Sequence, residues 1–383
     1  MVENINFTND VFQSKSPTIR IVKGLSSGTE TSLKIVQYSG KAENSSSPQA
    51  LTTLHSCKFQ NVTWTLPTVP YFIIIGAQKG GTTSMSEWLK LHPDILPGRY
   101  PKRKESHFFH GVFAGILSDW TKGIWKGSDD EFYCLARKRY AEVVFDVPAT
   151  MKSMVNGRSP KICFDKTPAY IHLKNCPEYV AKTCPWGVKL LVLLRNPIDR
   201  AYSQHEMDIF KSHHTYSSFE ERLQLEVQKM RRLGLNAMPI LPLNATISDI
   251  DRLIFPPLNK KNEQEKVAFE KLRGMPLLKK GMYAIQLREW LKWFPQQDIM
   301  LLYYEDLKAN PDDTYKKVQS FLGIRPHTLK NYSHFHIGKY SKPMSPVTRR
   351  YLYRFFEPYN SQLEALWGIK IHDNWRRQPS LII

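Results

Sequence analysis

A glycine-rich turn holds the first residues whose types and spacing could do chemistry. The stretch "FIIIGAQKGGTTSMSEWL" is an apolar run that breaks at glycines and then continues with helical spacing. A strand that ends in such a turn and leads into a helix directs backbone N–H groups and a helix dipole at one point. We therefore expect an anion there, approached closely at Gly80 and Gly81 and contacted by the hydroxyls of Thr82 and Thr83.

The position of Lys79 indicates which anion is bound. ATP-binding loops follow G-x-x-x-x-G-K-[ST]. Gly76 and Gly81 have this spacing, but Thr82 occupies the place of the lysine, and Lys79 precedes the paired glycines. We expect its ammonium to reach the bond between a 5′-phosphate and a transferring group. The alternative is a structural turn that binds nothing.

A second anchor follows the apolar run Lys189–Leu194. Arg195 comes directly after this expected strand, at the edge where open α/β sheets bind ligands. A helix that begins at Pro197 places Ser203 two turns inside it, facing the same crevice. Arg195 and Ser203 could hold a phosphate that ATP lacks, although a lone arginine could instead form an ordinary salt bridge.

The stretch "PKRKESHFFHG" holds a carboxylate and an imidazole close together. Glu105 lies two residues before His107. Transfer of an anionic group to a hydroxyl needs a base for the acceptor proton and a cation for the leaving oxygen. Glu105 can supply the first and Lys79 the second. The alternative is a solvated charged loop followed by two core phenylalanines.

These motifs together resemble the sulfotransferases that use 3′-phosphoadenosine 5′-phosphosulfate (PAPS), particularly the heparan-sulfate type. "GAQKGGTTSMSEWLKLHP" looks like their 5′-phosphosulfate loop, and "LRNPIDRAYS" is similar to their 3′-phosphate motif. The resemblance runs from about Pro67 to Trp375. It implies that PAPS, as co-substrate and with no metal, is bound by Lys79, Gly80, Gly81, Thr82, Thr83, Arg195 and Ser203.

The same resemblance implies roles for three further segments. "KESHFF" is similar to a family stretch with a catalytic glutamate and an assisting histidine, here Glu105 and His107. "DKTPAY" resembles a segment whose lysine, here Lys166, contacts the sulfo group or the acceptor. His110 departs from the aspartate of the 3-O branch. "GKYSKPMSPVTRR" resembles, more loosely, a basic loop that closes over the nucleotide at Lys339, Ser341 and Lys342.

The wider pattern predicts an α/β fold, a P-loop-like parallel sheet flanked by helices on both faces. We expect strands at Tyr71–Ile75, Lys189–Leu194 and Asp298–Tyr304. One expected helix begins at Pro197, a second covers 282–294, and a third ends at Gly323. Near the end of the chain we expect a pair of helices interrupted at Pro358. We predict an irregular leader over 1–66 and a single sulfotransferase domain over 67–383, with a loop-rich insertion at about 236–264.

Composition bounds the cellular setting. The formal net charge is +19, which favours anionic partners. No apolar run reaches a membrane-spanning length and no secretory signal is visible. Sequons occur at Asn6, Asn44, Asn61, Asn244 and Asn331, and the spacing of Cys176 and Cys184 permits a local disulfide. The family and the sequons indicate a glycoprotein of the Golgi lumen, whereas a soluble cytoplasmic or secreted protein also fits.

The function predicted from these patterns is transfer of a sulfo group from PAPS to a hydroxyl, or an amine, of a carbohydrate. The acceptor is expected to be a glycosaminoglycan-like or other anionic polysaccharide, with no nucleic acid involved. Membrane association is expected only if an N-terminal anchor is missing from this chain. The alternatives are a sulfotransferase of small metabolites, a P-loop kinase and a non-catalytic binder of polyanions.

Overall fold

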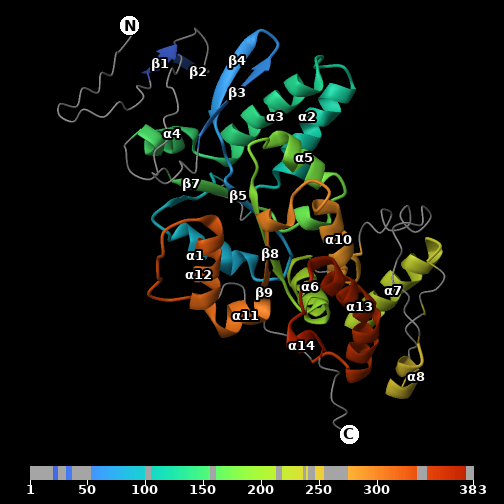
Figure 1. Ribbon diagram of the computed structural model, residues 1–383. Helices are drawn as coiled ribbons and strands as arrows, with labels where there is room; N and C mark the ends of the chain where they lie inside the picture. The colour runs from blue at the N-terminus through green and yellow to red at the C-terminus, as the bar shows by residue number, and fades with distance from the viewer. Residues whose placement is uncertain are drawn as a thin grey trace.

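Five parallel strands form the central sheet, in the order β6-β7-β5-β8-β9. Figure 1 labels β7, β5, β8 and β9 of this sheet. The computed structural model describes residues 20–24, 32–36, 53–99, 105–155, 161–212, 218–235, 239, 246–253, 275–333 and 343–376. The strands of this sheet are β5 (Phe72–Gly76), β6 (Ile95–Leu96), β7 (Ile162–Lys166), β8 (Lys189–Leu194) and β9 (Ile299–Tyr303). The expected α/β class is therefore confirmed.

Helices cover both faces of this sheet, and two antiparallel hairpins precede it. The hairpin strands are β1 (Arg20–Gly24), β2 (Ser32–Val36), β3 (Leu54–Phe59) and β4 (Val62–Pro67). The helices are α1 (Thr82–Lys90), α2 (Val112–Thr121), α3 (Asp129–Val144), α4 (Val147–Val155), α5 (Cys176–Thr183), α6 (Pro197–Ser212), α7 (Phe219–Arg232), α8 (Ile247–Asp251), α10 (Tyr283–Trp290), α11 (Tyr304–Ala309), α12 (Pro311–Leu322), α13 (Pro346–Trp367) and α14 (Asp373–Arg376).

The central strands are buried on both sides, which explains why their sequences are continuously apolar. Every residue of β5 is buried, and its side chains alternate between two cores. Phe72 and Ile74 pack with α1 and α12, whereas Ile73 and Ile75 pack with α3, α5 and α10. Figure 1 shows α1, α11 and α12 on one side of the sheet and α5, α6, α10 and α13 on the other. This packing fixes the carboxyl ends of β5, β7 and β8 side by side.

Local signals placed several boundaries correctly. Strand β8 has the predicted bounds, and β5 and β9 differ from prediction by one residue at their ends. Helix α6 begins at Pro197, where the Asn196 side chain accepts from the backbone N–H of Ile198 at 3.0 Å. Helix α12 ends at Gly323, whose φ of 68° is the left-handed conformation that ends many helices. The helix expected over 282–294 is shorter, because α10 ends at Trp290.

The predicted helix pair at the end of the chain is wrong. Helix α13 is continuous from Pro346 to Trp367 and contains Pro358. Proline removes one backbone hydrogen bond from a helix interior and costs about 3 kcal/mol. Phe355, Tyr359 and Leu363 are buried on the two sides of this proline. Burial of these large apolar side chains offsets that cost, since each contributes roughly 1.5–3 kcal/mol.

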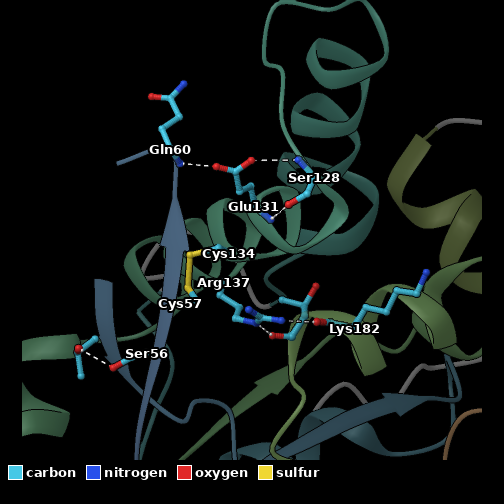
Figure 2. The surroundings of a disulfide bond; sticks show 10 residues. Ser56, Cys57, Gln60, Ser128, Glu131, Cys134, Arg137 and Lys182 are labelled. Atoms are coloured by element: carbon cyan, nitrogen blue, oxygen red, sulfur yellow. Dashed lines mark hydrogen bonds between the residues drawn. A yellow bond between two sulfur atoms is a disulfide. The ribbon is translucent and has the colours of Figure 1, made fainter. Parts of the chain in front are cut away.

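The end of the expected leader is also more ordered than the sequence indicated. Residues 54–67 form the β3–β4 hairpin, and a disulfide joins Cys57 of β3 to Cys134 of α3 (Figure 2). The backbone N–H of Gln60, in the turn of this hairpin, donates to Glu131 of α3 at 2.7 Å. This hairpin is thus attached to the helical layer, while the boundary between leader and domain stays a prediction. Most of the 236–264 insertion lies outside the described residues, apart from α8.

Candidate active site

The loop after β5 is held against β8 by its backbone. The N–H of Ala77 donates to the carbonyl oxygen of Leu193 at 2.8 Å, and the N–H of Gly80 donates to Ala77 at 3.0 Å. A Cβ at Gly80 would collide with that same Leu193 oxygen. A glycine is therefore needed at position 80, because only a residue without a Cβ lets the loop lie directly on the neighbouring strand. The sequence alone did not reveal this structural role.

The start of α1 follows a sharp turn of the backbone. Lys79 and Gly81 have φ values of 71° and 88°, so the chain reverses sharply before the helix begins at Thr82. The first amides of a helix lack intrahelical acceptors, and the dipole is positive at this end. No acidic residue lies in the first turn of α1. These features favour an anion at this turn, and its assignment to the 5′-phosphate of a nucleotide stays a prediction.

Arg195 connects this loop to the end of β8. Its Nη1 donates to the carbonyl oxygen of Lys79 at 3.4 Å, and its guanidinium lies 4.6 Å from the ring centroid of Tyr304. Ser203 is buried in the second turn of α6. The structure therefore brings Arg195 to the phosphate loop, and it places Ser203 on the helix that follows Arg195.

Glu305 fixes the turn after Arg195, a role that sequence reasoning missed. Its Oε1 accepts from the backbone N–H of Asn196 at 2.8 Å and from Nε1 of Trp375 at 3.1 Å. The carboxylate thus joins the carboxyl ends of β8 and β9 to α14. The position of Glu305 shortly after an apolar strand was the available sequence signal for this structural role.

Glu105, His107 and His110 form a chain of polar side chains. Oε2 of Glu105 lies 3.5 Å from Nε2 of His107, and Nδ1 of His107 lies 3.0 Å from Nε2 of His110. Glu105 and His107 are 24% and 39% exposed, so both can meet a ligand from solvent. Burial, and then the nearby His107, lower the pKa of His110 below its ordinary value. The arrangement can orient a carboxylate base through an imidazole.

A buried hydrogen-bond network links this chain to the end of β7. Thr167 follows Lys166, and its hydroxyl contacts the Ser106 hydroxyl and the backbone N–H of His107, both at 3.1 Å. The Tyr170 hydroxyl also contacts Ser106, at 3.1 Å. Lys166 is itself buried at the carboxyl end of β7, beside Ile74 of β5. The structure thus anchors the Glu105 segment on the residues that directly follow Lys166.

Asp165 is the centre of this network. It is fully buried, and its Oδ2 accepts from the hydroxyls of Tyr140 at 2.8 Å and Tyr170 at 3.2 Å. Burial raises the pKa of Asp165, and hydrogen bonds from Ser106 and both tyrosines oppose that rise. Sequence reasoning named Lys166 and passed over its neighbours. An aspartate inside an apolar strand was the signal that could have found them.

Three predicted site residues, Lys339, Ser341 and Lys342, lie outside the described residues. Within the described part of the chain, no group of three or more His, Cys, Asp or Glu side chains is arranged to hold a metal ion. Cys176 and Cys184 are both free and buried, so the local disulfide that their spacing permitted is not formed.

The sulfotransferase domain family matches residues 70–342. The chain belongs to this family. The matched range contains the phosphate loop, the Glu105 segment and the Arg195 motif, and the family consists of PAPS-dependent transferases. The resemblance found from the motifs is therefore confirmed at the level of the family.

Distant relatives of this sulfotransferase chain include proteins of several kinds. The chain is 23% identical to membrane-associated sulfotransferase kil1 of Dictyostelium discoideum, over 78% of this chain and 65% of the relative. It is 25% identical to carbohydrate sulfotransferase 15 of Mus musculus, over 81% of this chain and 55% of the relative. It is 23% identical to mouse heparan sulfate glucosamine 3-O-sulfotransferase 6, over 70% and 57%. The chain thus spans between about half and two thirds of the length of these relatives.

Among solved structures, a sulfotransferase from Alicyclobacillus acidocaldarius aligns with a TM-score of 0.48 and 24% identity. The alignment covers 80% of this chain and 99% of that one. In the described residues, no helix combines the length and the apolar character needed to cross a membrane.

Proposed function

We propose that this protein transfers the sulfo group of PAPS to a hydroxyl of a carbohydrate, with Glu105 as the base. The observation that carries the proposal is the meeting of three motifs at one sheet edge. The Lys79 loop, the Arg195 turn and the Lys166 strand end lie on neighbouring strands β5, β8 and β7. Family membership supports the donor, and the names of the distant relatives support a carbohydrate acceptor.

Different residues would hold the two phosphate positions of the donor. The amides of the first α1 turn, with the hydroxyls of Thr82 and Thr83, would hold the 5′-phosphate. Arg195 and Ser203 would hold the 3′-phosphate, which distinguishes this donor from ATP. A close contact of the loop with β8 keeps the two positions in a fixed relation. Lys339, Ser341 and Lys342 are proposed to complete the nucleotide site as a closing loop.

In the transfer, Glu105 would take the proton of the acceptor hydroxyl while the acceptor oxygen forms its bond to sulfur. The bond between sulfur and the 5′-phosphate oxygen breaks, so the products are a sulfate ester and 3′-phosphoadenosine 5′-phosphate. Lys79 and Lys166 would stabilise charge on the leaving and equatorial oxygens. His107, which contacts Glu105 at 3.5 Å, would orient this base.

The acceptor is proposed to be an anionic, glycosaminoglycan-like polysaccharide. The formal charge of +19 favours association with such a chain, because positive charge attracts and steers polyanions. An oxidising compartment such as the Golgi lumen is proposed on the basis of the Cys57–Cys134 disulfide. Asn61 and Asn331 are exposed sequon asparagines, so both are accessible to glycosylation in that compartment.

The donor is tested first by thermal melting. We expect 3′-phosphoadenosine 5′-phosphate to raise the melting temperature, with or without chelator, because a ligand of the native state stabilises it. ATP with Mg²⁺ should give no comparable shift. Stabilisation by ATP and Mg²⁺ alone would instead support a kinase. A salt-sensitive response to heparin without any response to nucleotide would support a non-catalytic binder of polyanions.

The base is tested by Glu105→Gln in a sulfate-transfer assay against a panel of glycans and small hydroxyl compounds. We expect turnover to fall by about 100-fold or more, because general base catalysis contributes roughly 10²–10⁴. Binding of 3′-phosphoadenosine 5′-phosphate should be unchanged. Glu142→Gln is the matched control, since Glu142 is a surface carboxylate of α3 paired only with neighbouring helix cations in the described structure. Full turnover by Glu105→Gln would remove Glu105 from the mechanism.

A further inference from the structure

Residues 275–281, which we term the 275–281 segment, contact the phosphate loop through Lys280. Nζ of Lys280 donates a hydrogen bond to Oε1 of Gln78, the residue before Lys79. The sequence motifs included neither Gln78 nor Lys280 among the site residues. An ammonium group has three N–H donors, so this bond leaves donors for a further ligand.

Two buried charged residues hold this segment in place. Nη2 of Arg200 in α6 donates to the carbonyl oxygens of Pro276 at 2.7 Å and Leu277 at 2.6 Å. Glu226 in α7 accepts from the backbone N–H groups of Leu277 at 3.1 Å and Leu278 at 2.9 Å. Arg200 is 0% and Glu226 5% exposed. Breaking either set would leave a charge buried without its hydrogen bonds, which is strongly unfavourable.

The surroundings of Lys280 carry an excess of positive charge. Burial, and then the nearby Arg200, lower the pKa of Lys280 to about 8, while Asp208 and Glu226 oppose this shift. Both of these carboxylates are engaged, since Asp208 pairs with Arg222 at 2.7 Å and Glu226 accepts backbone N–H groups. The positions around Lys280 thus have cations whose charge the nearby carboxylates do not fully balance.

His172 lies in the same group of residues. It belongs to the 3-10 turn Tyr170–His172, whose Ile171 side chain packs against Gly76 at the end of β5. Burial, and then the charges of Lys280 and Lys279, lower the pKa of His172 to about 3. Its Nε2 is buried and has no hydrogen-bond partner among the described residues. A neutral imidazole can donate one hydrogen bond to an anion at this place.

We propose that Gln78, Lys280 and His172 form a further oxyanion position beside the phosphate loop, which receives a sulfonate or sulfate group. The inference rests on the proposed function. Gln78 and Lys79 are adjacent, so the position adjoins the cation assigned to the leaving oxygen, on the side of β7 and α10. The oxyanion that we expect at this position is the sulfo group of the donor. A sulfate already carried by the acceptor has the same chemistry.

The test is Lys280→Met, with affinities for PAPS and for 3′-phosphoadenosine 5′-phosphate measured by calorimetry. Only PAPS carries the sulfo group. We expect Lys280→Met to weaken the binding of PAPS by about 10-fold or more, since a hydrogen bond from a charged group contributes roughly 1.5–3 kcal/mol. Affinity for the nucleotide without the sulfo group should change less than about twofold. Lys280→Arg, which keeps the charge, should retain part of the PAPS affinity.

Lys292→Met is the control, because Lys292 is 59% exposed and pairs with Glu289 on the surface. If PAPS binding is unchanged but the KM for a sulfated acceptor rises relative to a desulfated one, the oxyanion comes from the acceptor. Equal loss for both nucleotides, or no change in any of these constants, overturns the proposal. Failure of the wild-type protein to bind either nucleotide would instead refute the proposed function.

Gln78→Ala gives a second variant in case Lys280→Met does not fold. It removes the hydrogen-bond partner of Lys280 and keeps the cation. We expect a smaller loss of PAPS affinity in the same direction, again with little change for 3′-phosphoadenosine 5′-phosphate. A Gln78→Ala protein that binds both nucleotides as the wild type does, together with unchanged acceptor KM values, would also overturn the proposal.

Discussion

At the scale of single residues, Asp165 connects two parts of the site that the sequence keeps far apart. Tyr140 reaches it from α3, and Tyr170 reaches it from the turn after β7. Only Tyr170 also contacts Ser106 and the backbone N–H of Phe109, at 3.1 and 3.3 Å. The two tyrosines therefore share one carboxylate but differ in their connection to the Glu105 segment.

This difference gives a prediction for Tyr170→Phe against Tyr140→Phe. Each variant removes one buried donor to Asp165, so each should destabilise the protein by about 1–3 kcal/mol. Tyr170→Phe should in addition lower kcat for sulfate transfer, because the backbone of the Glu105 segment loses a contact. The affinity for 3′-phosphoadenosine 5′-phosphate should stay the same in both. Urea unfolding and steady-state kinetics measure these quantities, and equal kcat values in the two variants would contradict the positioning role.

The sequence identifies candidate site residues most readily where a motif is local. Lys79, Thr82 and the glycines lie within one turn, and Arg195 directly follows an apolar strand. The partners of Ser106, which adjoins Glu105, were harder to find, because Thr167 and Tyr170 are more than 60 positions away along the chain. Local spacing carries no record of such a contact, so only the folded chain reveals it.

At the scale of elements, strand β8, the start of α6 and the end of α12 were predictable, because each depends on nearby residues. A proline at the first helical position and a left-handed glycine after the last act within a single turn. The continuation of α13 through Pro358 depends instead on burial against other helices. The arrangement of the 275–281 segment is of the same kind, since α6 and α7 supply the groups that hold it.

Glu226, which accepts hydrogen bonds from the 275–281 segment, gives a prediction of pH dependence. Burial raises the pKa of Glu226 to about 7 from its ordinary value of 4.5, while backbone hydrogen bonds and the nearby Arg222 and Arg200 oppose the rise. The folded state then binds the proton more tightly than the unfolded state. The stability contributed by this titration is fully present below pH 4.5 and is lost as the pH rises towards 7.

Glu226→Gln removes this titration. We expect the difference in unfolding free energy, wild type minus variant, to fall by about 3 kcal/mol between pH 4.5 and pH 7.5. Urea unfolding at several pH values measures it, and comparison with the variant cancels the titration of the other groups. A difference that stays constant with pH would show that Glu226 has an ordinary pKa in the folded protein.

At the scale of the whole molecule, the sheet and its helical layers follow from the alternation of apolar strands and amphipathic helices, which the sequence shows directly. The attachment of the β3–β4 hairpin could not be predicted from this alternation. Cys57 and Cys134 are 77 positions apart, and with five cysteines the sequence alone does not select a pair. Figure 2 shows the disulfide between the hairpin and α3, near the contacts of Glu131 and Arg137.

This disulfide links the hairpin to α3, the helix that delivers Tyr140 to Asp165. Arg137, one turn further along α3, donates to the carbonyl oxygens of Thr183 at 3.0 Å and Lys182 at 2.9 Å at the end of α5. Covalent closure of a loop of this length restricts the unfolded chain, and removing a native disulfide costs about 2–5 kcal/mol. The bond therefore stabilises the layer that supports the buried network.

We expect the double variant Cys57→Ser with Cys134→Ser to lose about 2–4 kcal/mol of unfolding free energy. A reductant should lower the melting temperature of the wild type and leave that of the double variant unchanged. Thiol titration of the denatured, unreduced wild type should detect three free cysteines, Cys163, Cys176 and Cys184. Detection of all five thiols, with no effect of reductant on melting, would mean that the hairpin is held by its noncovalent contacts alone. Transfer activity of the folded double variant would then show how far the position of Tyr140 depends on the hairpin.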